Sequence, residues 1–83
     1  MARILIVEDE ESINTLIQMN LELVGHECTS IFDGQSALNV LKRETFDLIL
    51  LDVMLPEKDG FQVIEEIKDQ VSIIFFNCTR FVI

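Results

Sequence analysis

One stretch of the sequence, residues 46–61, limits what this chain can fold into more than any other. It reads F-D-L-I-L-L-D-V-M-L-P-E-K-D-G-F, so a continuous apolar run, Leu48 to Leu51, stops at Asp52. A short apolar run without alternation predicts a strand that is buried on both faces of a sheet. Pro56 ends strand pairing because it has no N–H to donate. Asp52 is therefore expected at the carboxyl end of a central strand, where open α/β sheets bind their ligands.

The rest of the chain alternates between strand-like and helix-like segments. Apolar runs predict further strands at residues 4–7 and 73–76, and a more polar segment, residues 26–32, predicts a strand at a sheet edge. Apolar residues at helical spacing predict three helices, over residues 13–24, 37–43 and 60–69. Gly25 is expected to end the first of them. This β-α-β-α-β-α-β order predicts an α/β fold, a doubly wound parallel sheet with helices on both faces.

Length and charge exclude several classes of protein. The chain has 83 residues, which allows one small domain, and its net charge is −9. Because phosphate contacts need Lys and Arg, we expect no nucleic-acid binding by this segment. The apolar run at residues 4–7 is too short for a signal peptide or a membrane span. Cys28 and Cys78 fit no metal-ligand spacing, which predicts reduced thiols in a cytoplasmic protein.

Acidic side chains follow two of the predicted buried strands. Glu8 and Asp9 come directly after the first strand, and Asp52 ends the third. If these strands are neighbours, three carboxylates converge at one sheet edge, where they shift their pKa values or hold a cation. Mg²⁺ suits such a site, and Asp52 could then act as a nucleophile toward a phosphoryl group. The alternative is that Glu8 and Asp9 only cap the first helix, and the pattern alone leaves both interpretations open.

Two motifs at this separation resemble the receiver domain of bacterial two-component response regulators, in their transcription-factor branch. They read I-L-I-V-E-D-E and L-I-L-L-D-V-M-L-P-x-x-D-G-F, and the resemblance covers residues 2–76. It implies a flavodoxin-like sheet of order 2-1-3-4-5, Mg²⁺ as cofactor, a sensor histidine kinase as partner, and a phosphoacceptor rather than an enzyme. The residues that match functional positions of the family are Asp52 as phosphoacceptor, Glu8 and Asp9 as the Mg²⁺-binding acids, Met54 as a backbone-carbonyl ligand, and Pro56 and Gly60 as loop-shaping residues.

The sequence departs from the family pattern after the fourth predicted strand. Asn77 stands where receivers have Thr or Ser, Cys78 stands where they have Ala, and no Lys follows. The chain is therefore expected to be a truncated receiver, residues 1–83, that lacks the last helix-strand-helix portion and has a divergent tail at 77–83. Without that hydroxyl and that Lys, we expect phosphorylation to be slow or absent. A shifted reading frame and a deliberate truncation both stay open as the origin of the tail.

Two other functions compete with the phosphoacceptor. An uncovered strand edge and sheet face predict self-association, so the chain could be an interaction module that does not switch. Such a module would bind its partners equally well after Asp52→Asn. The other candidate is a Mg²⁺-dependent phosphatase with Asp52 as nucleophile, but Met54 occupies the place where those enzymes have a second Asp. His26 is expected to be a solvated side chain on the edge strand.

Overall fold

Four parallel strands and two helices form the part of the fold that the computed structural model describes, residues 1–52 and 72–76. Their bounds, in chain order, are β1 (Arg3–Val7), α1 (Glu11–Leu23), β2 (Glu27–Ile31), α2 (Gly34–Leu41), β3 (Leu48–Asp52) and β4 (Ser72–Phe76). The strands lie in the order β2-β1-β3-β4, and every neighbouring pair is parallel. The predicted parallel α/β sheet is thus confirmed, while the helix predicted at 60–69 lies outside the described residues.

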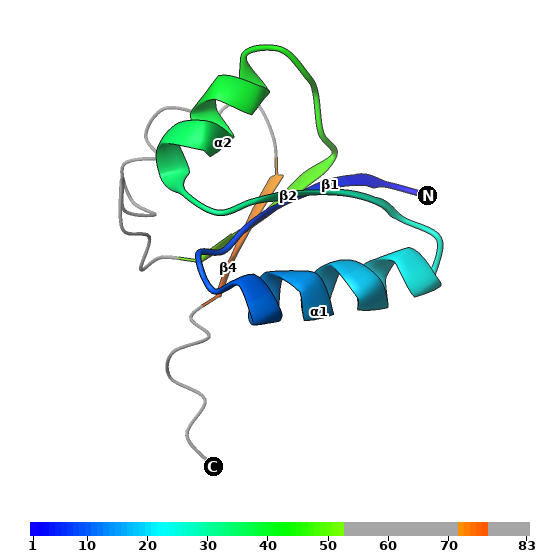
Figure 1. Ribbon diagram of the computed structural model, residues 1–83. Helices are drawn as coiled ribbons and strands as arrows, with labels where there is room; N and C mark the ends of the chain where they lie inside the picture. The colour runs from blue at the N-terminus through cyan, green and yellow to red at the C-terminus, as the bar shows by residue number, and fades with distance from the viewer. Residues whose placement is uncertain (53–71, 77–83) are drawn as a thin grey trace.

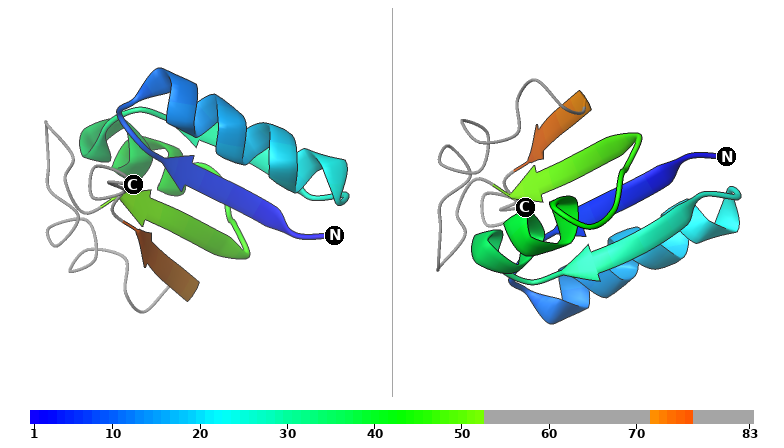
Figure 2. Two further views of the ribbon diagram at one scale, coloured as in Figure 1. Left: turned by 90° about the horizontal axis from the view of Figure 1, so that it is seen from below. Right: turned by 90° about the horizontal axis from the view of Figure 1, so that it is seen from above.

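The two helices cover opposite faces of the sheet, as a doubly wound fold requires (Figures 1 and 2). All four strands run in the same direction, so their carboxyl ends meet at one edge. Neither helix in residues 1–52 and 72–76 has the length and hydropathy that a membrane span needs.

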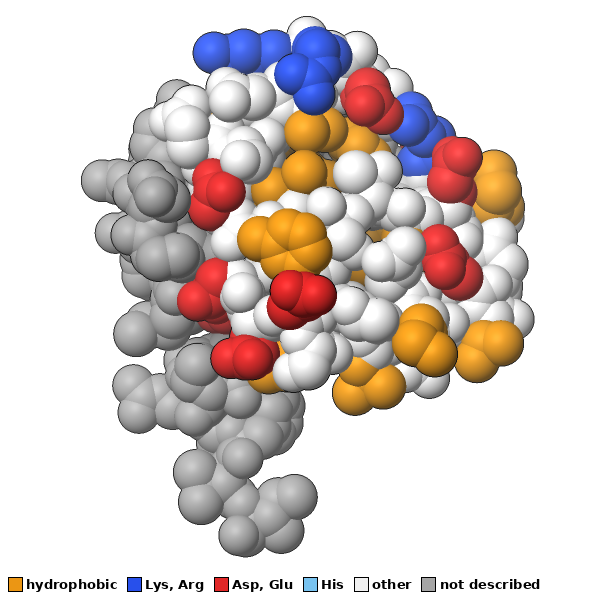
Figure 3. All heavy atoms as spheres, viewed as in Figure 1, with side chains coloured by type: hydrophobic (Ala, Val, Ile, Leu, Met, Phe, Trp, Pro, Cys, Tyr) orange, Lys and Arg blue, Asp and Glu red, His pale blue; other side chains and the backbone are white. Residues whose placement is uncertain are grey.

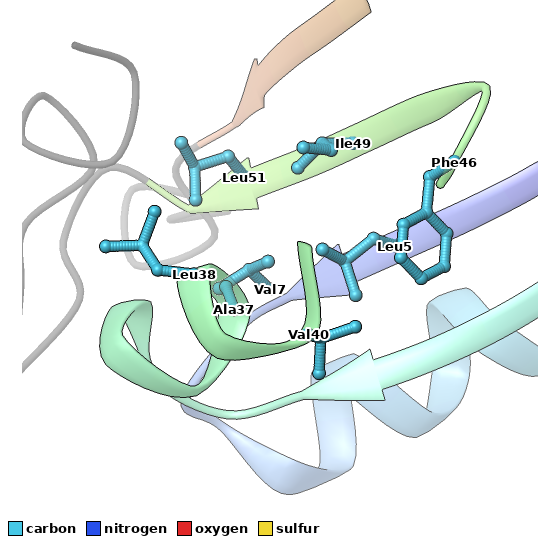
Figure 4. Packing of buried hydrophobic residues seen from close by; sticks show 8 residues of the cluster. All are labelled: Leu5, Val7, Ala37, Leu38, Val40, Phe46, Ile49 and Leu51. Carbon is cyan, nitrogen blue, oxygen red and sulfur yellow. The ribbon is translucent and has the colours of Figure 1, made fainter. Parts of the chain in front are cut away.

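The main hydrophobic core lies between α2 and the sheet (Figure 4). Because side chains alternate along a strand, every second residue of β1 and β3 points into it. Its members are Leu5, Val7, Ala37, Leu38, Val40, Phe46, Ile49 and Leu51. Asp33 fixes the start of α2, because its Oδ1 accepts the Ser36 N–H at 2.7 Å. This cap sets the helix so that its apolar face meets the strands.

The α1 side of the sheet is covered less completely. Ile4 and Ile6 of β1 are buried, but Leu48 and Leu50 of β3 are only half-buried. The prediction that this strand is buried on both faces is therefore wrong for its α1 side. An unbroken apolar run shows that both faces of a strand are apolar, but it does not show that each face is covered.

The helix α1 also exposes more apolar surface than its sequence pattern predicted. Leu16 is 60% exposed and Val24, the C-cap residue that follows the helix, is 71% exposed, whereas Ile13, Ile17 and Leu21 are half-buried. A helix this long turns one stripe of side chains toward a sheet, and Leu16 lies beside that stripe. The apolar residues of α1 thus form two rows, of which one faces outward.

The turn after α1 confirms the prediction for Gly25 and corrects the prediction for His26. Gly25 has a positive φ of 96°, which a glycine adopts without strain, and it ends the helix as predicted. His26, by contrast, is not a solvated side chain. It is half-buried, and its Nδ1 accepts the backbone N–H of Ala2 at 3.1 Å. Cys28, also half-buried, is a free thiol.

Candidate metal centre

The strand register brings the three predicted acids to one place. Val7 is level with Leu51 in the parallel pair of β1 and β3, so the next residues, Glu8 and Asp52, also lie side by side at the carboxyl edge. Asp9 follows Glu8 in the connection to α1. One carboxylate oxygen from each of these acids lies within 4.8 Å of those of the other two. The sequence predicted that these three carboxylates converge if their strands are neighbours. The strands are neighbours, and the carboxylates do converge.

The members of this acidic cluster (Glu8, Asp9 and Asp52) differ in their access to solvent. Glu8 is 1% exposed and Asp52 is 0% exposed, while Asp9 is exposed. Figure 3 shows further acidic side chains on the surface of the molecule. The site thus has two buried carboxylates and one that is exposed to solvent. A solvated cation can reach the site from the exposed side.

Burial makes the negative charge of this cluster costly. Loss of hydration raises the pKa of Glu8 to about 7, and the neighbouring carboxylates of Asp52 and Asp9 act in the same direction. The backbone N–H of Glu10 opposes them by donating to Glu8 Oε2 at 2.6 Å. A raised pKa of this kind indicates that Glu8 lacks a positive partner among the described protein groups, and a bound cation would supply one.

The capping alternative is correct in part. Glu8 Oε2 accepts the N–H of Glu10, the N-cap residue of α1, so this carboxylate does stabilise the start of the helix. Its other oxygen, Oε1, is buried and accepts no hydrogen bond from the described residues. Hard carboxylate oxygens are the ligands that Mg²⁺ prefers, and it needs few of them because it keeps several waters. The residues present therefore fit a magnesium ion, with capping and metal binding divided between the two oxygens of Glu8.

One residue at this edge was missed in the sequence. Asn14 of α1 is 0% exposed, and its Nδ2 donates to the backbone oxygens of Glu8 and Ile31 at 3.1 and 3.0 Å. The sequence signal that could have identified Asn14 is its position, as a polar residue, among the apolar residues on the inward side of the predicted helix. The other predicted site residues, Met54, Pro56, Gly60 and Asn77, lie outside the described residues.

Comparison with known protein families gives a match over most of the chain. The model of the response regulator receiver domain matches residues 4–80. The alkaline phosphatase synthesis transcriptional regulatory protein PhoP of Bacillus subtilis is 48% identical over 68 residues, which are 82% of this chain and 28% of PhoP. The transcriptional regulatory protein AfsQ1 of Streptomyces coelicolor is 40% identical over 76 residues, 89% of this chain and 34% of AfsQ1. The chain thus spans about a third or less of these relatives.

Solved structures are similar in fold as well as in sequence. The response regulator TrrA of Thermotoga maritima, in complex with Mg²⁺ and BeF, has a TM-score of 0.85 and 31% identity, covering 96% of this chain and 75% of that one. The receiver domain of a sensor histidine kinase from Pseudomonas aeruginosa, with a magnesium ion in its active site cleft, has a TM-score of 0.83 and 35% identity. It covers 89% of this chain and 65% of that one.

Proposed function

Because the chain belongs to the response regulator receiver domain family, we propose that it accepts a phosphoryl group on Asp52 in two-component signalling. The observation that carries the proposal is the acidic cluster, whose three carboxylates converge within 4.8 Å at the carboxyl edge of the sheet. Two of the three are buried, which is uncommon for acids unless they bind a cation or share protons.

In this proposal each acid of the cluster has a separate role. Glu8 and Asp9 hold Mg²⁺ with Asp52, and the backbone carbonyl of Met54 is a further ligand that the family resemblance implies. A carboxylate oxygen of Asp52 forms a bond to phosphorus while the bond from phosphorus to the donor breaks and the donor leaves with its electron pair. Bound Mg²⁺ would neutralise charge on the phosphoryl oxygens. The protein's own contribution is a rigid strand end that presents Asp52 at the sheet edge.

The proposed partner is a sensor histidine kinase, which supplies the phosphoryl group to receivers of this family. The net charge of −9 supports the proposal that this segment itself binds no nucleic acid, because it would repel the phosphate backbone. A cytoplasmic location belongs to the same proposal, since the kinase would meet its receiver there.

The direct test is phosphoryl transfer from acetyl phosphate to the purified chain. With Mg²⁺ present, we expect the intact mass to increase by one phosphoryl group, at a slow rate because Asn77 replaces the usual hydroxyl residue. Chelation of Mg²⁺ should abolish the increase. An unchanged mass after long incubation, with the protein folded and Mg²⁺ bound, would contradict the phosphoacceptor and leave only a metal-binding receiver fold.

Self-association is a second proposal, and the exposed apolar row on α1 supports it. Leu16, Met19 and Leu23 recur at helical spacing and are 60%, 58% and 83% exposed. Hydrophobic side chains are visible on the surface in Figure 3. We expect sedimentation velocity to show dimers or larger species at micromolar concentration, and the double change Leu16→Ser, Leu23→Ser to shift them toward monomer. The matched control is Thr15→Ser, Asn20→Ser; a monomeric wild-type protein would refute the proposal.

A further inference from the structure

Asn14 lies beside the acidic cluster and donates a hydrogen bond to the backbone of Glu8, one of its members. We propose that Asn14 is a positioning residue, which fixes the backbone of Glu8 and so sets the geometry in which the acidic cluster binds a divalent cation. This inference rests on the proposed function, because it concerns the affinity of the same site. Its basis is one buried amide that joins the ends of two strands to the first turn of a helix.

The contacts of Asn14 define this joint. The side chain is fully buried, and its Nδ2 donates to the backbone oxygens of Glu8 and Ile31 at 3.1 and 3.0 Å. The backbone N–H of Glu8 donates to the same Ile31 oxygen at 3.1 Å. Both partners of the amide are carbonyls, which only accept, so the nitrogen and not the oxygen of Asn14 must face them.

These bonds hold Glu8 from both sides of its backbone. Glu8 lies one residue beyond β1. Its N–H donates to the carbonyl of Ile31 in the neighbouring strand, and its own carbonyl accepts from Asn14. The carbonyl carbon of Glu8 is bonded directly to the nitrogen of Asp9. One amide therefore restrains the main chain that bears two of the three acids, and the third acid, Asp52, is already fixed by its strand.

The chemistry of the amide suits this place. A Lys or Arg side chain could also donate to both carbonyls, but its positive charge would oppose a cation in the acidic cluster. Asparagine supplies two N–H groups without charge. The Oδ1 atom is buried and receives no hydrogen bond from the described residues, which costs stability. A leucine of similar size would avoid that cost, but it would leave the carbonyl of Glu8 without the hydrogen bond from the amide, so the amide is what holds this carbonyl in place.

The test compares Asn14→Leu with Asn20→Leu. Asn20 lies on the same helix, and its Nδ2 also donates to a backbone oxygen, that of Leu16 at 2.8 Å, but it is exposed and distant from the strand ends. Mg²⁺ affinity is measured by calorimetry on protein that circular dichroism shows to be folded. We expect Asn14→Leu to weaken Mg²⁺ binding about tenfold and Asn20→Leu to leave it unchanged. In other metal sites, the loss of groups that orient the ligands has an effect of this size.

A second readout separates this inference from the proposed function. Hydrogen exchange measured by NMR without metal should show faster exchange of the Glu8 amide in Asn14→Leu and no change in Asn20→Leu. If the wild type fails to bind Mg²⁺, the proposed function fails, and the exchange rate alone decides whether Asn14 restrains Glu8. Equal Mg²⁺ affinities, or an unchanged Glu8 exchange rate, would overturn the inference. If Asn14→Leu does not fold, Asn14→Ala and Asn20→Ala replace the pair with the same expectations.

Discussion

Replacing Asp52 with asparagine should abolish phosphoryl transfer from acetyl phosphate, while the wild-type chain gains one phosphoryl group in the presence of Mg²⁺. The amide of asparagine is a poor nucleophile. Apart from Glu8, no other carboxylate of the acidic cluster lies at the end of a buried strand. Asparagine has the size of aspartate and removes one of three like charges, so we expect the fold to survive. Intact mass spectrometry of both proteins, with and without Mg²⁺, measures the difference.

The matched control is Asp47→Asn. Asp47 precedes the same strand, β3, but it is exposed at the opposite edge of the sheet, where its Oδ2 accepts the backbone N–H of Arg3 at 2.8 Å. This variant should be labelled to the same extent as the wild type. Labelling of Asp52→Asn would show that another side chain accepts the group and would contradict the assignment of Asp52.

The second large effect is a pH dependence of Mg²⁺ binding that originates in Glu8. Because burial raises the pKa of Glu8 to about 7, a cation must displace a proton from this carboxylate at lower pH. We expect the apparent Mg²⁺ affinity to be about tenfold weaker at about pH 6 than at about pH 8, with a plateau above the pKa. Calorimetric titrations over this range, together with the number of protons released per ion, measure the effect.

The same pKa has a consequence for stability without metal. The folded-state pKa of Glu8, about 7, lies above its ordinary value of 4.5, so folded protein keeps a proton that the unfolded chain releases between those pH values. The contribution of Glu8 to stability is thus fully present below 4.5 and is lost as the pH rises through 7. We expect the free energy of unfolding to fall by on the order of 3 kcal/mol across this interval, and Mg²⁺ to offset the fall.

Glu8→Gln separates this effect from the other acids. It should remove both the loss of stability and most of the pH dependence, because glutamine does not titrate. The control is Glu27→Gln at the opposite edge, which loses only an exposed ion pair with Arg3 and should keep both slopes. Urea unfolding at several pH values measures the stabilities. A wild-type curve as flat as that of Glu8→Gln would show that Glu8 titrates near its ordinary pKa.

The sequence predicted the acidic cluster for the case that the first and third strands are neighbours, and the pairing of β1 with β3 meets that condition. Glu8 and Asp52 each follow an apolar run, and parallel strands place their carboxyl ends at one edge whatever the details of packing. The buried strands follow from short continuous apolar runs, and both described helices follow from apolar residues at helical spacing. The part of the site that comes from Met54 onward stays a prediction.

Other features were not predictable because they depend on how the elements cover one another. Asn14 meets Glu8 and Ile31 only through the way α1 crosses the ends of two strands, which no local pattern specifies. The incomplete burial of Leu50 and the exposure of Leu16 have the same origin. Periodicity identifies which side chains share a face, but the coverage of that face is a property of the tertiary structure.

The central place of β1 has a consequence for synthesis on the ribosome. This strand is made first, yet it pairs with β2 on one side and with β3 on the other. A nascent chain that has emerged only as far as β2 already contains Glu8 and Asp9. The other edge of β1 stays unpaired until β3 (Leu48–Asp52) has been synthesised. Asp52 is the last residue of that strand, so pairing of β3 and completion of the acidic cluster are one event. A partly made chain therefore has no complete acidic cluster before its sheet has closed around β1.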